Sequence, residues 1–130
     1  MKIRFAVADD AAFLRELIKN LMSSEGHLCV GEAENGQDAI ELVARTLPDI
    51  LFLDMVMPLK NGLETAKAVK ESYPEVKIIG CSTIDSEAMI EKAYEAGFDN
   101  YITKPFTKDS ILKAISKVLA QSGESSHGRI

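Results

Sequence analysis

Carboxylates follow two short apolar runs of this sequence. Asp9 and Asp10 come directly after IRFAVA, and Asp54 comes directly after ILFL. If both runs are parallel strands of one sheet, these side chains meet at its carboxyl edge, where ligands bind in open α/β sheets. Carboxylates that lie together repel each other unless a divalent cation joins them. The spacing therefore predicts a site for a divalent cation.

A hydroxyl and an amine end two further apolar runs. Ser82 closes KIIGCS, and Lys104, followed by Pro105, comes after NYIT. An ammonium group beside bound metal suits a negatively charged ligand, so the four strand ends together indicate a magnesium site that handles phosphate. Each residue alone has an ordinary alternative. Asp9 or Asp10 can cap a helix, Ser82 can bond to neighbouring backbone, and Lys104 can be a surface lysine.

The elements that must position these residues follow from the hydrophobic pattern. It alternates between strand and helix periods, which is typical of βα repeats. The predicted strands are residues 3–8, 28–33, 49–53, 77–82 and 99–103. The predicted helices lie around residues 13–21, 39–43, 63–69, 86–96 and 108–121. Right-handed crossovers then place helices on both faces of one parallel sheet, so we expect a doubly wound α/β fold with five strands and five helices.

Turn residues agree with this division of the chain. Asn35-Gly36 and Asn61-Gly62 suit the starts of helices, and Gly97 suits a helix C-cap. The run DILFLD is almost continuously apolar, as expected for a central strand that is covered on both faces. We expect one folded domain over residues 1–121 and a flexible polar tail over residues 122–130.

The composition limits the class of protein. The chain has 130 residues, 46% of them hydrophobic, and a formal charge of −5. It has no basic stripe for nucleic acid, no apolar run long enough to span a membrane and no signal-peptide pattern. Cys29 and Cys81 lie in apolar runs, so we expect them to be buried thiols in a reducing compartment. We therefore expect a monomer in the cytoplasm that binds neither nucleic acid nor membranes.

Four stretches carry a resemblance to a known family. DDAAFLR, PDILFLDMVMPLKNG, KIIGCST and NYITKPF together resemble the receiver domains of two-component response regulators, over about residues 2–121. The resemblance implies a flavodoxin-like (CheY-like) sheet with the strand order 2-1-3-4-5. DDAAFLR, the short chain and Tyr101 three residues before Lys104 are most similar to the single-domain chemotaxis regulators of this family. A receiver cut from a transcription factor shares these features.

The resemblance also implies roles for the acidic residues. Asp54 matches the phosphoacceptor, whose carboxylate takes a phosphoryl group from a sensor histidine kinase or a small phosphodonor. Asp10, Asp54 and the backbone carbonyl of Val56 match the direct Mg²⁺ ligands, and Asp9 matches the acid that binds the metal through water. Oxygen ligands of this kind are those that Mg²⁺ prefers.

The remaining roles concern the response to phosphorylation. Ser82 and Lys104 match the hydroxyl and the ammonium group that hold the phosphoryl oxygens, and the peptide bond before Pro105 is cis in the family. Tyr101 matches an aromatic switch that turns into space vacated when Ser82 moves. The implied partners are the kinase, a phosphatase and a target protein, such as the flagellar motor switch, that reads the face around Tyr101.

Three residues depart from the family pattern. Val56 and Ile84 are apolar at the two positions where polar side chains can orient the water that attacks the acyl phosphate. We therefore expect slow self-dephosphorylation. Thr83 replaces the small residue that usually follows the switch hydroxyl, and we expect its bulk to narrow the path of Tyr101.

Other classes of protein fit the sequence less well. Haloacid-dehalogenase-type phosphatases carry a second Asp two residues after the nucleophile, where this chain has Val56, so we do not expect an enzyme that turns over an external substrate. Neither GxxxxGK[ST] nor GxGxxG occurs, which disfavours nucleotide or flavin binding. A receiver-like module that works without phosphorylation remains an alternative. Such a module predicts that some polar residues of the site are lost, whereas this chain has all five: Asp9, Asp10, Asp54, Ser82 and Lys104.

Overall fold

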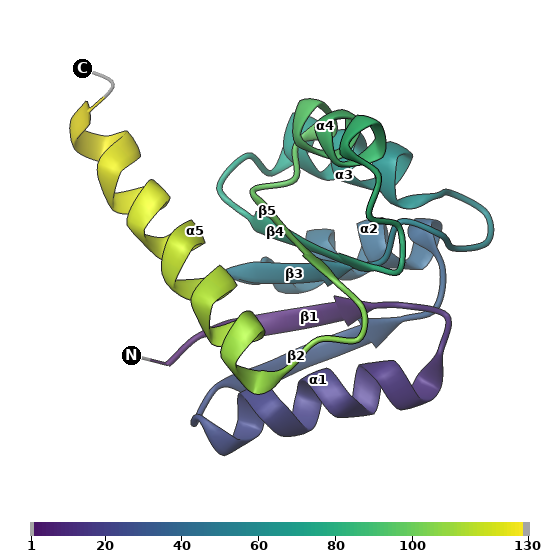
Figure 1. Cartoon of the computed structure of the whole chain (residues 1–130), viewed down its shortest axis with the longest axis horizontal. Coiled ribbons are helices and arrows are strands. Elements are labelled where there is room, and N and C mark those ends of the chain that lie inside the picture. The colour runs from purple at the N-terminus through teal and green to yellow at the C-terminus, as the bar shows by residue number, and fades with distance from the viewer. Residues whose placement is uncertain (1, 129–130) are drawn as a thin grey trace.

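Strands and helices alternate along the whole chain in the computed structural model, which describes the backbone of residues 2–128 and the side chains of residues 2–120 (Figure 1). The strands are β1 (Arg4–Ala8), β2 (Leu28–Ala33), β3 (Ile50–Leu53), β4 (Lys77–Ser82) and β5 (Asn100–Thr103). The helices are α1 (Ala12–Ser24), α2 (Gly36–Thr46), α3 (Gly62–Ser72), α4 (Glu87–Ala96) and α5 (Lys108–Gly128). Three strands begin one residue later than predicted, at Arg4, Ile50 and Asn100.

The five strands form one parallel sheet in the order β2-β1-β3-β4-β5. The predicted fold class and strand order are therefore confirmed. One hydrophobic core packs α2, α3 and α4 against one face of the sheet, and a second core packs α1 and α5 against the other face. Figure 1 shows the same layers, with α1 and α5 on one side of the strands.

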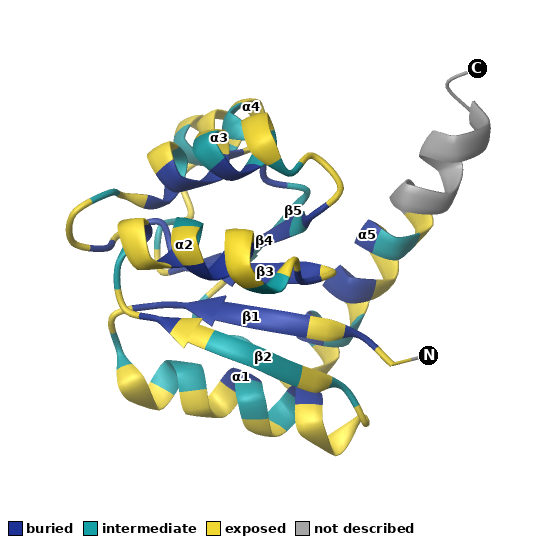
Figure 2. Ribbon diagram, turned by 180° about the vertical axis from the view of Figure 1, so that it is seen from behind, coloured by how far each residue is buried: buried dark blue, intermediate teal, exposed yellow. Residues whose placement is uncertain are grey.

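The two cores take alternate residues of the central strands. In β1, Phe5 and Val7 belong to the core under α1 and α5, whereas Ala6 and Ala8 belong to the opposite core. All four residues of β3 are buried, which confirms the prediction of a central strand covered on both faces (Figure 2). The carboxyl ends of β1 and β3 are consequently held rigidly side by side.

Helix caps occur where the sequence predicts them. The Asn35 side chain accepts a hydrogen bond from the Asp38 backbone N–H at 2.8 Å. Asn61 and Glu64 form a reciprocal capping box at the start of α3. Gly97 ends α4 with φ of 119°, in the left-handed region that favours glycine.

The end of α5 and one cysteine differ from expectation. The α5 backbone continues to Gly128, past the predicted helix end at 121, while residues 129–130 and the side chains from 121 onward lie outside the described residues. The flexible tail over 122–130 and the domain boundary therefore stay predictions.

Cys81 is a buried free thiol as expected, but the free thiol of Cys29 is only half-buried because β2 is an edge strand. Within the described residues, no helix combines the length and the hydrophobicity needed to cross a membrane.

Candidate functional site

The backbone of the sheet fixes two of the acidic residues. The Asp9 N–H donates to the Ala33 carbonyl at 3.0 Å, and the Asp54 N–H donates to the Ala8 carbonyl at 3.0 Å. The hydrogen bonds between strands thus continue one residue past the ends of β1 and β3. Asp9 and Asp54 are therefore placed by the sheet itself and not by a free loop.

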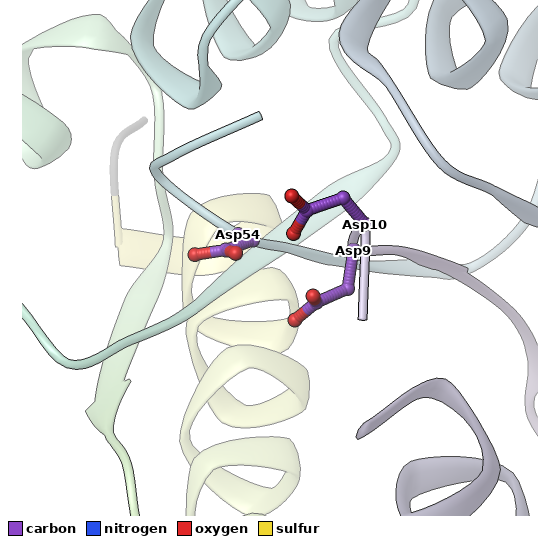
Figure 3. Close-up of side chains that lie close together, drawn as sticks. All are labelled: Asp9, Asp10 and Asp54. Carbon is purple, nitrogen blue, oxygen red and sulfur yellow. The ribbon is translucent and has the colours of Figure 1, made fainter. Parts of the chain in front are cut away.

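Three carboxylates come together at this edge. One oxygen each from Asp9, Asp10 and Asp54 lies within 4.8 Å of the others. Asp9 and Asp54 are buried, with 1% and 6% of their surface exposed, while Asp10 is exposed. Figure 3 shows Asp9 and Asp10, which follow β1, beside Asp54, which follows β3. This donor set of hard oxygen atoms, partly exposed on one side, fits a magnesium ion that keeps some of its water.

The capping alternative for the first two acids is wrong. The N-cap of α1 is Ala11, and no side chain caps this helix by a hydrogen bond. Asp9 Oδ1 instead accepts a hydrogen bond from the Ala11 N–H at 2.9 Å, which fixes the orientation of its carboxylate. The second oxygen of Asp9 then points toward the other polar residues of the site.

Lys104 lies inside the site and is not a surface lysine. Its Nζ is 2.9 Å from Asp9 Oδ2 and 3.5 Å from Asp54 Oδ2, and its side chain is 11% exposed. Burial alone lowers the pKa of Lys104, but the hydrogen bond that Lys104 donates to Asp9 and the charges of Asp54 and Asp9 outweigh burial and raise that pKa overall. The ammonium group therefore stays protonated. The peptide bond between Lys104 and Pro105 is cis, as the resemblance implies.

Asp54 carries an unfavourable charge in the absence of a cation. Burial raises the pKa of its carboxyl, and the charge of Asp9 raises it further. Lys104 and the Val56 N–H, which donates to Asp54 Oδ1 at 3.4 Å, offset this effect only in part, so the pKa remains above its usual value. A bound cation relieves this repulsion.

Ser82 and Tyr101 meet at a third residue. Ser82 is buried, and its Oγ accepts a hydrogen bond from the Ile84 N–H at 3.4 Å. The Tyr101 hydroxyl donates to the Ile84 carbonyl at 2.9 Å. The ordinary alternative for Ser82, a bond to neighbouring backbone, is thus present, and it joins Ser82 to the residue that holds Tyr101. Burial raises the pKa of Tyr101, and the nearby Ser82 side chain opposes the rise in part.

Arg15 supports the site, a role that the sequence does not predict. Its Nη1 donates to the Asp9 carbonyl at 2.7 Å, and its Nε donates to Glu32 Oε1 at 2.9 Å. Arg15 therefore joins α1 and β2 to the backbone of an acidic residue of the site. Helical periodicity places Arg15 beside the apolar face of α1, but no sequence pattern identifies a partner in another element.

The loop between β3 and α3 forms an apolar rim near the acids. Val56 and Leu59 are 61% and 77% exposed, although both are large hydrophobic residues. Leu59 also has a left-handed backbone, with φ of 68°. Gly62 closes the loop, because its N–H donates to the Met55 carbonyl at 2.9 Å. The Val56 side chain is therefore accessible to solvent.

Comparison with known proteins assigns the chain to a family. The response regulator receiver domain model matches residues 5–116. The chemotaxis protein CheY of Thermotoga maritima is 37% identical over 115 residues, which are 88% of this chain and 96% of the relative. The chemotaxis protein CheY of Halobacterium salinarum is 41% identical over 113 residues, which are 87% of this chain and 93% of the relative.

A solved structure supports the same assignment. The signal receiver domain of the response regulator NarL from Mycobacterium tuberculosis has a TM-score of 0.84 and 33% identity, covering 88% of this chain and 94% of that one. The sequence match and the shared fold therefore agree with the arrangement of acids and lysine at the sheet edge. The chain belongs to the response regulator receiver domains of two-component signalling.

Proposed function

We propose that this receiver domain is a phosphorylation-controlled switch whose phosphoacceptor is Asp54. The observation that carries the proposal is the meeting of three carboxylates within 4.8 Å of one another, with the Lys104 ammonium 2.9 Å from one of them. A metal-binding acidic cluster and a fixed cation together suit a phosphoryl group, which needs positive charge around its oxygens.

The proposed reaction transfers a phosphoryl group to Asp54. A carboxylate oxygen attacks the phosphorus of a phosphohistidine on a sensor kinase. An oxygen–phosphorus bond forms while the nitrogen–phosphorus bond breaks, and the imidazole nitrogen keeps the bonding electron pair. Asp54 suits this role because the sheet fixes its backbone and its side chain still has 8% of its surface exposed.

Asp10, Asp54 and the Val56 carbonyl would hold Mg²⁺ directly, and Asp9 would hold it through water. When bound, Mg²⁺ supplies positive charge against the charge of the phosphoryl group. Lys104 supports a second phosphoryl oxygen, since its ammonium group already lies 3.5 Å from the Asp54 carboxylate. Asp9 orients Lys104 through their 2.9 Å hydrogen bond.

The proposed output is a change of the face made by α4, β5 and α5. Ser82 moves toward the phosphoryl group, and Tyr101 responds because both residues bond to the backbone of Ile84. A groove of about 430 Å³ on this face is lined by residues of all three elements, among them Ile90, Tyr101 and Ser110. A target protein that prefers one form of the groove shifts the population toward it.

Intact-mass spectrometry after incubation with acetyl phosphate tests the phosphoacceptor. We expect a single phosphoryl adduct that requires Mg²⁺ and is absent from Asp54→Asn. Asp38→Asn is a matched control, because Asp38 is an acidic residue at the start of α2 that does not belong to the metal cluster. An adduct that survives in Asp54→Asn contradicts the assignment of Asp54.

The alternative module predicts a different result in the same experiment. If the folded chain neither binds Mg²⁺ nor forms an adduct with acetyl phosphate or a kinase, it acts without phosphorylation. If it binds Mg²⁺ and accepts phosphate only from a kinase, the proposed function stands with a narrow donor requirement.

We place the switch in chemotaxis or motility because the two curated relatives described above are chemotaxis proteins. Deletion of the gene should abolish directed spreading on soft agar, and the wild-type gene, but not Asp54→Asn, should restore it. The similarity to the NarL receiver supports a second candidate, a receiver that belongs to a larger regulator. The reading frame decides between them, since it either stops after residue 130 or continues into an output domain.

A further inference from the structure

Gly80 occupies a position in β4 where a side chain does not fit. An ideal Cβ at Gly80 would lie 2.7 Å from Tyr101 Cδ2 and 2.8 Å from Cδ2 and Cε2 of Phe98. These distances are well inside ordinary contact between carbon atoms, about 3.5–4.0 Å. Gly80 pairs regularly with Leu53 and Tyr101 in the sheet, so its role is to leave space and not to allow an unusual backbone.

The two aromatic rings over Gly80 are not equally free to move. Phe98 is 3% exposed and belongs to the core under α2, α3 and α4, and its N–H bonds to the Ala93 carbonyl at 3.0 Å. Tyr101 is only half-buried and lies on β5, an edge strand. The ring centroids of Phe98 and Tyr101 are 6.3 Å apart. A methyl group at position 80 therefore displaces Tyr101 before it displaces Phe98.

Displacement of the Tyr101 ring also affects its hydroxyl. The hydroxyl reaches the Ile84 carbonyl at 2.9 Å only while the ring lies over β4. The N–H of the same residue bonds to Ser82 at 3.4 Å. The space above Gly80 thus determines whether Tyr101 is connected to the residue that contacts Ser82.

We propose that Gly80 is a positioning residue for Tyr101: it admits the ring over β4 and keeps the Tyr101 hydroxyl on the Ile84 carbonyl. The consequence for signalling rests on the proposed function. The Tyr101 ring already lies over β4 without a phosphoryl group. The chain therefore needs little rearrangement to place the ring there. Gly80→Ala should increase the population of molecules in which the Tyr101 ring has turned away from β4. It should thereby weaken the coupling between the acidic site and the α4, β5 and α5 face.

Nuclear magnetic resonance of the full chain with ¹³C-labelled tyrosine tests the positioning. The chain has three tyrosines and no tryptophan, so the ring signals are few. In Gly80→Ala we expect the Tyr101 ring signals to shift and the Tyr101 phenol to titrate nearer its ordinary pKa, because the ring becomes exposed. Signals of Tyr73, which does not line the groove with Tyr101, should stay in place.

Gly31→Ala is the matched control. Gly31 also lies inside a strand, and an added Cβ would meet Leu42 Cδ1 at 2.5 Å, on another part of the sheet. It should lower stability without moving the Tyr101 signals. Unchanged Tyr101 signals in Gly80→Ala, or equal changes in Gly31→Ala, would overturn the proposal.

A double-mutant cycle covers the case in which Gly80→Ala folds poorly. We expect Gly80→Ala to lower the thermal midpoint by about 5 °C or more in the wild-type background. In the Tyr101→Ala background the loss should fall by at least half, since only the Phe98 contacts remain. An equal loss in both backgrounds, or a double variant that does not fold, shows that Phe98 carries the clash and overturns the proposal.

Beryllofluoride, an analogue of the phosphoryl group, tests the consequence in the presence of Mg²⁺. We expect Gly80→Ala to weaken its binding about fivefold or more, with unchanged Mg²⁺ affinity. Unchanged beryllofluoride binding despite a displaced Tyr101 would refute the coupling. If the wild-type chain binds none, the proposed phosphoacceptor function fails, while the tyrosine spectra still decide the role of Gly80.

Discussion

Ser82 and Tyr101 are joined through the backbone of one residue, Ile84. The Ile84 N–H donates to Ser82 Oγ at 3.4 Å, and the Ile84 carbonyl accepts from the Tyr101 hydroxyl at 2.9 Å. Ser82 ends β4 next to the acidic site, and Tyr101 lies in β5 on the proposed output face. A movement of Ser82 therefore reaches Tyr101 through a single residue.

Replacement of Ser82 should separate metal binding from the response to phosphate. Ser82→Ala removes a hydroxyl that would bond to a charged phosphoryl oxygen, a contribution of about 1.5–3 kcal/mol. We expect beryllofluoride affinity to fall about tenfold or more by titration, with Mg²⁺ affinity nearly unchanged. Ser86→Ala is the control, because Ser86 caps α4 and its loss should affect stability but not beryllofluoride. Equal affinities for Ser82→Ala and wild type would remove Ser82 from the phosphoryl site.

Neutralising Asp54 should stabilise the metal-free protein. The pKa of Asp54 is raised in the folded state by burial and by Asp9, so its ionisation destabilises the fold above that pKa. This cost disappears as the pH falls through the raised pKa toward the usual value. We expect Asp54→Asn to have the higher thermal midpoint at neutral pH in chelator, and the difference to shrink in acid.

The same calorimetry with saturating Mg²⁺ provides a second comparison. Mg²⁺ should raise the thermal midpoint of the wild type more than that of Asp54→Asn, because the variant lacks one ligand. Asp109→Asn, an exposed change on α5, should behave like the wild type in both conditions. A less stable Asp54→Asn in chelator at neutral pH would show that repulsion at the site is not the dominant effect.

Relief of the left-handed backbone at Leu59 should stabilise the chain. Leu59 has φ of 68° and is 77% exposed, so its side chain gains little from burial. A left-handed conformation costs a residue with a Cβ about 1–2 kcal/mol, and glycine avoids most of this cost. We expect Leu59→Gly to raise the free energy of unfolding by about 0.5 kcal/mol in urea denaturation.

Val56→Gly is the control for the loop. Val56 is also exposed, at 61%, but its φ is not positive, so glycine there only adds freedom to the unfolded chain and should destabilise. If both variants lose stability equally, the conformation of Leu59 is not strained.

Polar residues beside Asp54 should shorten the lifetime of the phosphorylated state. The apolar Val56 and Ile84 give the attacking water no hydrogen-bond partner, although the Val56 side chain is accessible. We expect Val56→Asn with Ile84→Glu to speed the loss of the phosphoryl adduct several-fold, measured by intact mass over time after the phosphodonor is removed. Leu59→Asn adds a polar group elsewhere in the loop and should leave the rate unchanged. If the double variant loses its phosphoryl adduct at the wild-type rate, the prediction is contradicted.

The hydrophobic pattern predicts the parallel sheet and the acidic cluster for the same reason, whereas the strand order follows only from the resemblance to receiver domains. Parallel strands end at one edge, so Asp9 and Asp54 are brought together once β1 and β3 are recognised. The contact of Lys104 with Asp9 spans 95 positions of the chain, yet it follows from the same rule. Fold and cluster thus depend on patterns that are local in sequence and repeated.

Other features depend on packing that no local pattern records. The Arg15 bond to the Asp9 carbonyl needs the rotation of α1 over the sheet. The space above Gly80 needs the ring positions of Phe98 and Tyr101, and the left-handed backbone of Leu59 needs the closure of its loop. The half-burial of Cys29 follows from the edge position of β2, which an apolar run cannot reveal.

The hydrogen bonds from the Asp9 and Asp54 N–H groups to neighbouring strands make the acidic site part of the hydrogen-bonded sheet. These two amides should exchange with deuterium only when the whole domain opens, whereas amides of the Leu59 loop exchange through local fluctuations. Destabilising mutations far from the site should therefore not loosen the site by degrees. They lower the fraction of molecules that possess it, and each molecule that remains folded keeps the acidic site intact.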